Sequence, residues 1–263
     1  MPVAHLNGTE LHYRDIGSSK DVVLLLHAFP LHSGMWTRLV AALEKRHRVI
    51  APDYRGLGRS SVPPEALTMD IVAEDLRALL AHLRVERAAV VGLSMGGYAA
   101  FELHRRVPGL FRGLVLCDTK ATADGEEARA ARERFAQSAI ERGLGWVADE
   151  MVPRLVRRAP DPAVVKEVRH LIAGGTPAGV AAAQRGMARR PDSTATLASI
   201  SCPALVVVGE EDGLTPPAEA EKMAAAVKSA RVARIPEAGH LSNLEAPAAF
   251  QAAVTAFLKT LPA

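Results

Sequence analysis

A glycine–serine–glycine pattern stands near the middle of the chain, where Gly92-Leu93-Ser94-Met95-Gly96 follows the apolar residues 88–91. Small and apolar residues up to position 107 then favour a helix. A strand, a very tight turn and a helix in this order place a serine at the turn, with its hydroxyl projecting out of the sheet. The serine backbone is strained there, and Gly92 and Gly96 flank it because larger side chains would collide across the turn. The pattern predicts Ser94 as a nucleophile, with the backbone N–H of Met95 directed at a developing negative oxygen.

A serine hydroxyl needs a general base, and the base needs an acid to orient it. His240 suits the first role because it follows the last strand-like run, residues 231–235, and sites form at the carboxyl ends of strands in open α/β sheets. The turn after the preceding strand offers Asp212 as the acid. Two rivals stay open on this reasoning: the neighbouring Glu211, and Asp118, which ends the strand after the serine's helix.

A second N–H for the oxyanion must come from the loop after an early strand. Residues 22–26 form a continuous aliphatic run, and His27-Ala28-Phe29-Pro30 follows it. Phe29 is the predicted donor, because Pro30 has no N–H and stiffens the loop. Asp53 also ends a strand, but its glycine- and arginine-rich surroundings favour a role as a loop anchor.

The elements that must position these residues alternate along the chain. An Asn7-Gly8 turn predicts an N-terminal hairpin. Residues 119–199 are rich in Ala and Arg, helical in propensity and without a strand-like run. We therefore predict an α/β fold with a mostly parallel, eight-stranded sheet flanked by helices, a core of residues 1–118 and 200–263, and a helical cap of residues 119–199. Beyond the hairpin, strands are expected at 22–26, 47–51, 88–93, 113–117, 204–209 and 231–235, and helices at about 35–43, 68–83, 95–107, 217–227 and 247–261.

The composition limits the classes of partner. Of 263 residues, 49% are hydrophobic and 23% charged, and the net charge is only +3, so nothing favours nucleic acid. No run is long and apolar enough for a membrane span. Cys117 and Cys202 indicate neither a disulfide framework nor a metal site. We expect a cytoplasmic protein with no leader, metal or cofactor. The sequence does not distinguish a monomer from a homo-oligomer.

As an ordered set, five segments resemble the α/β-hydrolase superfamily: residues 27–30, 53–60, 92–97, 209–212 and 239–240. The glycine–serine–glycine turn and residues 238–245 are similar to the 3-oxoadipate enol-lactonase-like branch, and residues 27–36 are closer to the cofactor-free esterase/haloperoxidase-like branch. The resemblance implies Ser94 as nucleophile, His240 as base, Asp212 as acid, and the Phe29 and Met95 N–H groups as oxyanion donors. The family usually has glycine where this chain has Ala28.

The function implied is hydrolysis of a small carboxylic ester or lactone through an acyl-enzyme, with no cofactor. The same three residues could instead cleave a C–C bond, or carry out perhydrolysis, in which peroxide replaces water. A third alternative is a ligand receptor that has this fold but no enzymatic activity. A serine rather than an aspartate at position 94 argues against dehalogenation.

The second half of the cap is selectively basic. Residues 151–192 carry eight basic and three acidic side chains, whereas residues 119–150 carry five and seven. One interpretation is a solvated helix face, and the other is that one or two arginines hold a substrate carboxylate by paired N–H bonds. Arg185, together with Trp36 near the oxyanion loop, is a predicted substrate contact.

Overall fold

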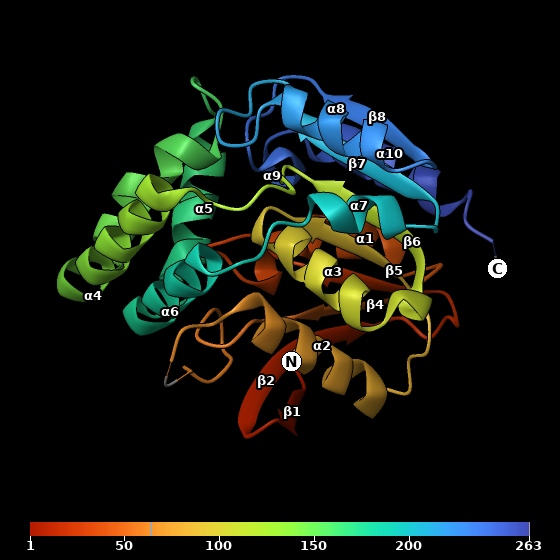
Figure 1. Ribbon diagram of the computed structural model, residues 1–263, viewed down its shortest axis with the longest axis horizontal. Helices are drawn as coiled ribbons and strands as arrows, with labels where there is room; N and C mark the ends of the chain where they lie inside the picture. Colours follow the sequence, from red (N-terminus) through yellow and green to blue (C-terminus); the bar gives the residue numbers. More distant parts are fainter. Residues whose placement is uncertain (64, 263) are drawn as a thin grey trace.

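The computed structural model describes residues 1–63 and 65–262, and an eight-stranded sheet in the order β1-β2-β4-β3-β5-β6-β7-β8 runs through its centre (Figure 1). Strands β4, β3, β5, β6, β7 and β8 pair in parallel, whereas β2 is antiparallel to both β1 and β4. The predicted α/β fold is confirmed. The strands are β1 (Val3–Leu6), β2 (Thr9–Ile16), β3 (Val22–Leu26), β4 (Arg48–Pro52), β5 (Ala88–Leu93), β6 (Phe111–Cys117), β7 (Ala204–Gly209) and β8 (Ala230–Ile235).

The central strands are apolar because both of their faces are covered. Every residue of β3, β5, β6 and β7 is buried, which is the environment that continuous aliphatic runs require. The N-terminal hairpin turns at Asn7 and Gly8, whose φ angles of 50° and 70° suit a two-residue turn between twisted strands.

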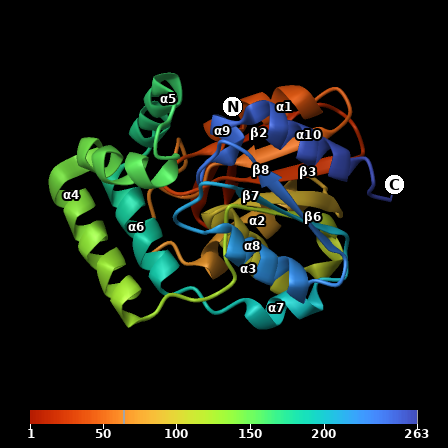
Figure 2. The same ribbon diagram turned by 90° about the horizontal axis from the view of Figure 1, so that it is seen from above.

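Helices pack on both faces of the sheet. Figure 2 shows α1 and α10 on one face and α2, α3 and α8 on the other. Helix α3 lies directly against β5 and β3, so it begins beside the middle of the sheet. The helices of these layers are α1 (Thr37–Leu43), α2 (Met69–His82), α3 (Met95–Arg106), α8 (Pro217–Ala226) and α10 (Pro247–Leu258), with the short α9 (Ser242–Glu245) before α10.

Three helices between β6 and β7 lie together at one side of the sheet: α4 (Glu126–Leu155), α5 (Pro162–Ala173) and α6 (Pro177–Ala188) (Figure 1). Helix α4 packs against both α5 and α6, and we call these three the cap helices. The chain of α4 bends at Gly143, whose φ of 78° is not helical. The fourth helix of the segment, α7 (Thr194–Ser199), contacts α8 of the sheet's helix layer instead.

Local differences from the sequence prediction concern element ends. The helix expected at about residues 35–43 is divided into a 3₁₀ turn, η1 (Ser33–Trp36), and α1, because the His32 imidazole accepts the Gly34 N–H and starts the turn early. Strand β6 begins two residues before the expected position, directly after the 3₁₀ turn η2 (Pro108–Leu110). None of the helices within residues 1–63 and 65–262 combines the length and apolarity of a membrane crossing.

Candidate active site

Ser94 lies at the turn between β5 and α3 in a conformation rare for any residue but glycine, with φ 55° and ψ −112°. Its N–H donates to the carbonyl oxygen of Cys117 at 2.9 Å, and the Thr119 hydroxyl donates to its carbonyl oxygen at 2.8 Å. Both partners belong to the end of β6 or the loop after it. The neighbouring strand therefore holds the strained turn in place.

The start of α3 approaches the end of β3 very closely. A methyl group at Gly96 would lie 2.1 Å from the carbonyl oxygen of Leu26. Only glycine fits this contact without a shift of backbone, which explains the second glycine of the motif. The contact brings the Ser94 turn beside the loop after β3, which carries Phe29.

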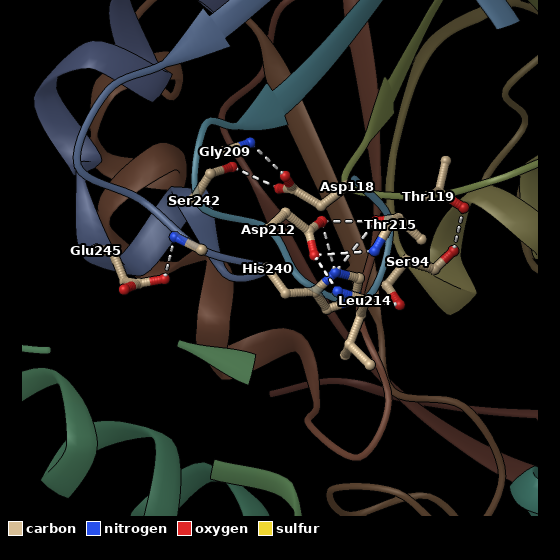
Figure 3. Close-up of polar contacts among 11 residues, drawn as sticks. Ser94, Asp118, Thr119, Gly209, Asp212, Leu214, Thr215, His240, Ser242 and Glu245 are labelled. Carbon is tan, nitrogen blue, oxygen red and sulfur yellow. Dashed lines mark hydrogen bonds and ion pairs between the residues drawn. The ribbon is translucent and has the colours of Figure 1, made fainter. Parts of the chain in front are cut away.

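His240 connects Ser94 to Asp212 (Figure 3). Its Nε2 lies 2.8 Å from Ser94 Oγ, and its Nδ1 lies 2.9 Å from Asp212 Oδ2. Because an ionised carboxylate only accepts, Nδ1 carries the proton and Nε2 is left to accept from the serine hydroxyl. The three side chains come from the carboxyl ends of β5, β7 and β8, and the histidine and aspartate are almost fully buried.

The Asp212 carboxylate is oriented by the turn that follows it. Oδ1 accepts the backbone N–H groups of Leu214 and Thr215 at 2.8 and 2.9 Å, and Oδ2 accepts the Thr215 hydroxyl at 2.6 Å. Sequence reasoning missed Thr215. Its signal is the Asp-x-x-Thr spacing, which allows a carboxylate to bond its own turn.

Burial and charge act in opposite directions on this pair. Burial lowers the pKa of His240, but the hydrogen bond and negative charge of Asp212 outweigh it, and the pKa lies above its ordinary value. Burial raises the pKa of Asp212, but His240 and Thr215 outweigh it and lower the pKa. Asp212 is therefore ionised at neutral pH and stabilises a proton on His240.

The two rival acids have other partners. Asp118 Oδ1 accepts the Gly209 N–H at 2.8 Å and Oδ2 accepts the Ser242 hydroxyl (Figure 3). Burial raises the pKa of Asp118 to about 8. Glu211 is exposed and lies 3.8 Å from the Arg157 guanidinium. Of the three candidates, Asp212 is the carboxylate that contacts the imidazole.

The predicted oxyanion donors lie on the two segments that meet at Ser94. Met95 is the first residue of α3, and Phe29 lines the same cavity as Ser94. Within residues 1–63 and 65–262, neither backbone N–H donates to a protein acceptor, so both are available to a ligand oxygen.

A buried histidine fixes the Phe29 loop. His27 Nδ1–H donates to the carbonyl oxygen of Ala28, and its Nε2 accepts the Tyr54 N–H, both at 3.0 Å. Burial lowers the pKa of His27 to about 4, so the imidazole stays neutral and keeps both bonds. The methyl group of Ala28, where the family usually has glycine, is fully buried.

A cavity of about 290 Å³ lies between the strand ends and the cap helices, with Ser94 and His240 in its wall. The ring of Phe29 meets Phe135 of α4 edge-on at 6.3 Å between centroids, so the core and the cap touch beside the predicted oxyanion donor. Among the residues that the structure describes, no three His, Cys, Asp or Glu side chains are grouped to hold a metal ion. Further apolar lining comes from Met151, Leu155, Met187 and Leu214.

Residues 21–247 match the family model of the alpha/beta hydrolase fold. The chain belongs to the α/β-hydrolase family. Among curated relatives, this hydrolase is 30% identical to 3-oxoadipate enol-lactonase 2 of Acinetobacter baylyi over 271 residues, which span 98% of this chain and 99% of the relative.

Solved structures agree with this placement. A thermophilic esterase from Thermogutta terrifontis, described with malate bound, shares 41% identity at a TM-score of 0.93, covering 98% of this hydrolase and 96% of the esterase. The enol-lactonase from Burkholderia xenovorans shares 32% identity at a TM-score of 0.90, covering 98% and 100%. The predicted likeness to enol-lactonases and esterases is confirmed.

Two predicted substrate contacts of this hydrolase lie away from the cavity. Trp36 is fully buried, with its ring 6.2 Å from that of Phe250 in α10. Arg185 pairs with Glu133 at 2.8 Å on the surface of the cap. The cavity wall, as far as the chain is described, includes neither. The structure therefore corrects both placements: Trp36 packs in the core, and Arg185 joins α6 to α4.

The positive side of the cavity includes Arg154, from the basic second half of the cap, and two cations that sequence reasoning missed. Lys120 and Arg132 line it together with Asp124, and both lie in the half of the cap that has more acids than bases. Asp124 is buried, which opposes ionisation, but Arg190 and Arg132, at 2.6 and 2.5 Å, lower its pKa to about 2. Lys120 lies farther from it, at 3.7 Å. No sequence signal distinguished these cations from surface residues.

Proposed function

We propose that this α/β hydrolase cleaves a small carboxylic ester or lactone through an acyl-enzyme on Ser94. The observation that carries the proposal is the continuous contact from Ser94 Oγ through His240 to Asp212, at 2.8 and 2.9 Å, in the wall of a cavity. The esterase and enol-lactonase relatives support the same bond type.

In the first half of the reaction, Ser94 Oγ attacks the carbonyl carbon while His240 Nε2 takes the hydroxyl proton. The carbonyl oxygen becomes negative and is stabilised by the N–H groups of Phe29 and Met95. When the tetrahedral intermediate collapses, the carbon–oxygen bond of the ester breaks and His240 returns its proton to the departing alkoxide. In a lactone, that alcohol stays attached to the acyl group.

In the second half, a water molecule gives a proton to His240 and attacks the acyl carbon. Collapse of the second intermediate breaks the bond to Ser94, which regains its proton from His240, and the acid leaves. Asp212 stabilises the imidazolium at each stage and keeps the same tautomer available. The steps use only side chains, backbone N–H groups and water.

A carboxylate on the substrate fits the positive side of the cavity. Lys120, Arg132 and Arg154 line it. Among the described residues of the lining, Asp124 is the one acid, and it pairs with both Arg190 and Arg132. In the described chain, Nη2 of Arg132 has no hydrogen-bond partner. The malate in the related esterase and the 3-oxoadipate in the relatives' name are both dicarboxylates, which supports an acidic ester or lactone as substrate.

The proposal is tested with Ser94→Ala on a panel of small esters, lactones and amides. We expect ester or lactone turnover to fall by ~10⁴-fold or more while thermal unfolding stays near that of the wild type. A serine-directed organophosphate should label Ser94 in the wild type only. Full hydrolysis by the purified variant would contradict the nucleophile assignment, and failure to label the wild type would favour a ligand receptor.

A further inference from the structure

The Glu245 carboxylate, at the end of α9, joins two segments that are far apart in the sequence. Oε1 accepts the N–H of Gly239, the residue before His240, at 2.8 Å (Figure 3). Oε2 accepts the N–H of Arg157, just beyond the end of α4, at 2.8 Å. Residues 236–241 carry His240 between β8 and α9, and we call them the histidine loop. One side chain therefore ties the histidine loop to the cap through two charge-assisted hydrogen bonds.

The same two segments meet again on the other side of the histidine. The N–H of Leu241 donates to the carbonyl oxygen of Leu155 at 3.0 Å. A methyl group at Gly239 would lie 2.5 Å from the Arg157 nitrogen, so glycine is required for the backbones to come this close. The residues before and after His240 are thus both bonded to the end of α4, directly or through Glu245.

This connection reaches the cavity. Leu155, whose carbonyl accepts the Leu241 N–H, also lines the cavity, as does Met151 one turn earlier in α4. Asp212 contacts only Nδ1 of the imidazole and does not fix the backbone that carries it. The backbone is held instead by bonds along the loop: the Ala238 carbonyl oxygen accepts the Glu211 N–H at 2.9 Å, and the Ser242 hydroxyl donates to Asp118. The Glu245 bridge adds the bond at Gly239, directly before His240, and links it to the cap.

We propose that Glu245 is a positioning residue for the hydrolysis described above, because it fixes the loop of His240 against the cap. The position of the cap relative to the core then determines the position of the base. The inference rests on the proposed function. It assigns Glu245 no contact with substrate, and its effect is exerted through the alignment of His240 Nε2 with Ser94 Oγ.

The test is Glu245→Gln, which keeps the size of the side chain. One amide oxygen can still accept one N–H, but the amide NH₂ then faces the other N–H, and the bridge is lost. We expect kcat to fall by about 10- to 100-fold while KM stays within about twofold, because the base is displaced and the binding surface is not. Organophosphate labelling of Ser94 should slow by a similar factor.

Glu211→Gln is the matched control. It removes the same charge near Arg157 from an exposed side chain that makes no bond to the histidine loop. Its kcat should stay within about twofold of the wild type. Wild-type kcat in Glu245→Gln, an equal loss in Glu211→Gln, or a rise in KM with unchanged labelling would each overturn the inference. If Ser94→Ala is inactive in any of these cases, the proposed function still stands.

A measurement on the wild-type protein covers the case in which Glu245→Gln does not fold. Amide hydrogen exchange should protect the peptide around residues 239–241 as strongly as the peptide around residues 155–157, because the bridge makes them open together. Exchange of residues 239–241 at the rate of an exposed loop, with residues 155–157 protected, would show that the two segments move independently and would refute the positioning role.

Discussion

The His240 imidazole contacts both other residues of the site, because one ring nitrogen faces Ser94 and the other faces Asp212. It acts as a base only when neutral. Its pKa lies above the ordinary value, since the Asp212 charge outweighs the effect of burial. In the free enzyme, a proton on His240 prevents it from acting as a base. We therefore expect kcat/KM to fall as the pH is lowered, with a midpoint above about pH 6.5.

Asp212→Asn tests the acid assignment and the sign of this shift together. Loss of the carboxylate removes both the tautomer control and the main group that raises the pKa of His240. We expect kcat to fall by about 10⁴-fold and the acid limb of kcat/KM to move to lower pH. The measurement is a pH profile of kcat/KM for both proteins.

Asp118→Asn is the comparison for that experiment. Asp118 contacts Gly209 and Ser242 rather than His240, so its amide variant should lose far less activity. A severe loss in Asp118→Asn with a mild one in Asp212→Asn would mean that the acid has been assigned to the wrong residue.

At the scale of elements, the strand–turn–helix of β5 and α3 is held from two sides. Strand β6 and its following loop bond the backbone of Ser94, and the end of β3 presses against Gly96. The strained serine persists because these neighbours leave its backbone no relaxed alternative. The element is therefore rigid before substrate arrives.

Gly96→Ala measures how tightly that element is packed. The new methyl group would meet the Leu26 backbone at 2.1 Å, and a backbone neighbour cannot rotate away. We expect the free energy of unfolding to fall by about 1–3 kcal/mol or more, measured by denaturant titration. Gly109→Ala is the control, since a methyl group there meets no atom within 4 Å. Equal stability of the two variants would mean that the strand–turn–helix of β5 and α3 accommodates the methyl group at no cost.

At the scale of the whole molecule, the cavity exists only where the cap helices meet the strand ends. The core supplies the reacting groups, and the segment between β6 and β7 supplies the positive side and much of the apolar wall. Selectivity for a charged substrate should therefore depend on residues distant in sequence from the reacting groups.

Lys120→Gln tests that selectivity. Loss of one charge-assisted hydrogen bond should lower kcat/KM for a carboxylate-bearing ester by roughly 10- to 100-fold and leave a neutral ester of the same leaving group unchanged. Arg185→Gln, on the cap surface, should change neither. The comparison is made across a salt series, because a preference that salt abolishes reflects diffuse attraction only. Equal losses on both esters would exclude a carboxylate site at Lys120.

The sequence by itself determined the features that depend on local spacing. Continuous aliphatic runs predict strands covered on both faces, and a serine between two glycines predicts a tight strand–helix turn. The serine, an acid and the histidine each follow a strand-like run. Parallel strands present their carboxyl ends at one edge of the sheet, so the sequence alone predicts that these residues lie together.

Only the tertiary structure decided which carboxylate faces His240 and which cations reach the cavity. Asp118 and Asp212 both follow strands, but their contacts depend on how three separate loops fold over one another. Arg185 and Arg132 lie on cap helices with similar propensities, yet Arg132 turns inward and Arg185 outward. The direction of a side chain is set by the packing of segments far apart in the chain, and no local pattern encodes that packing.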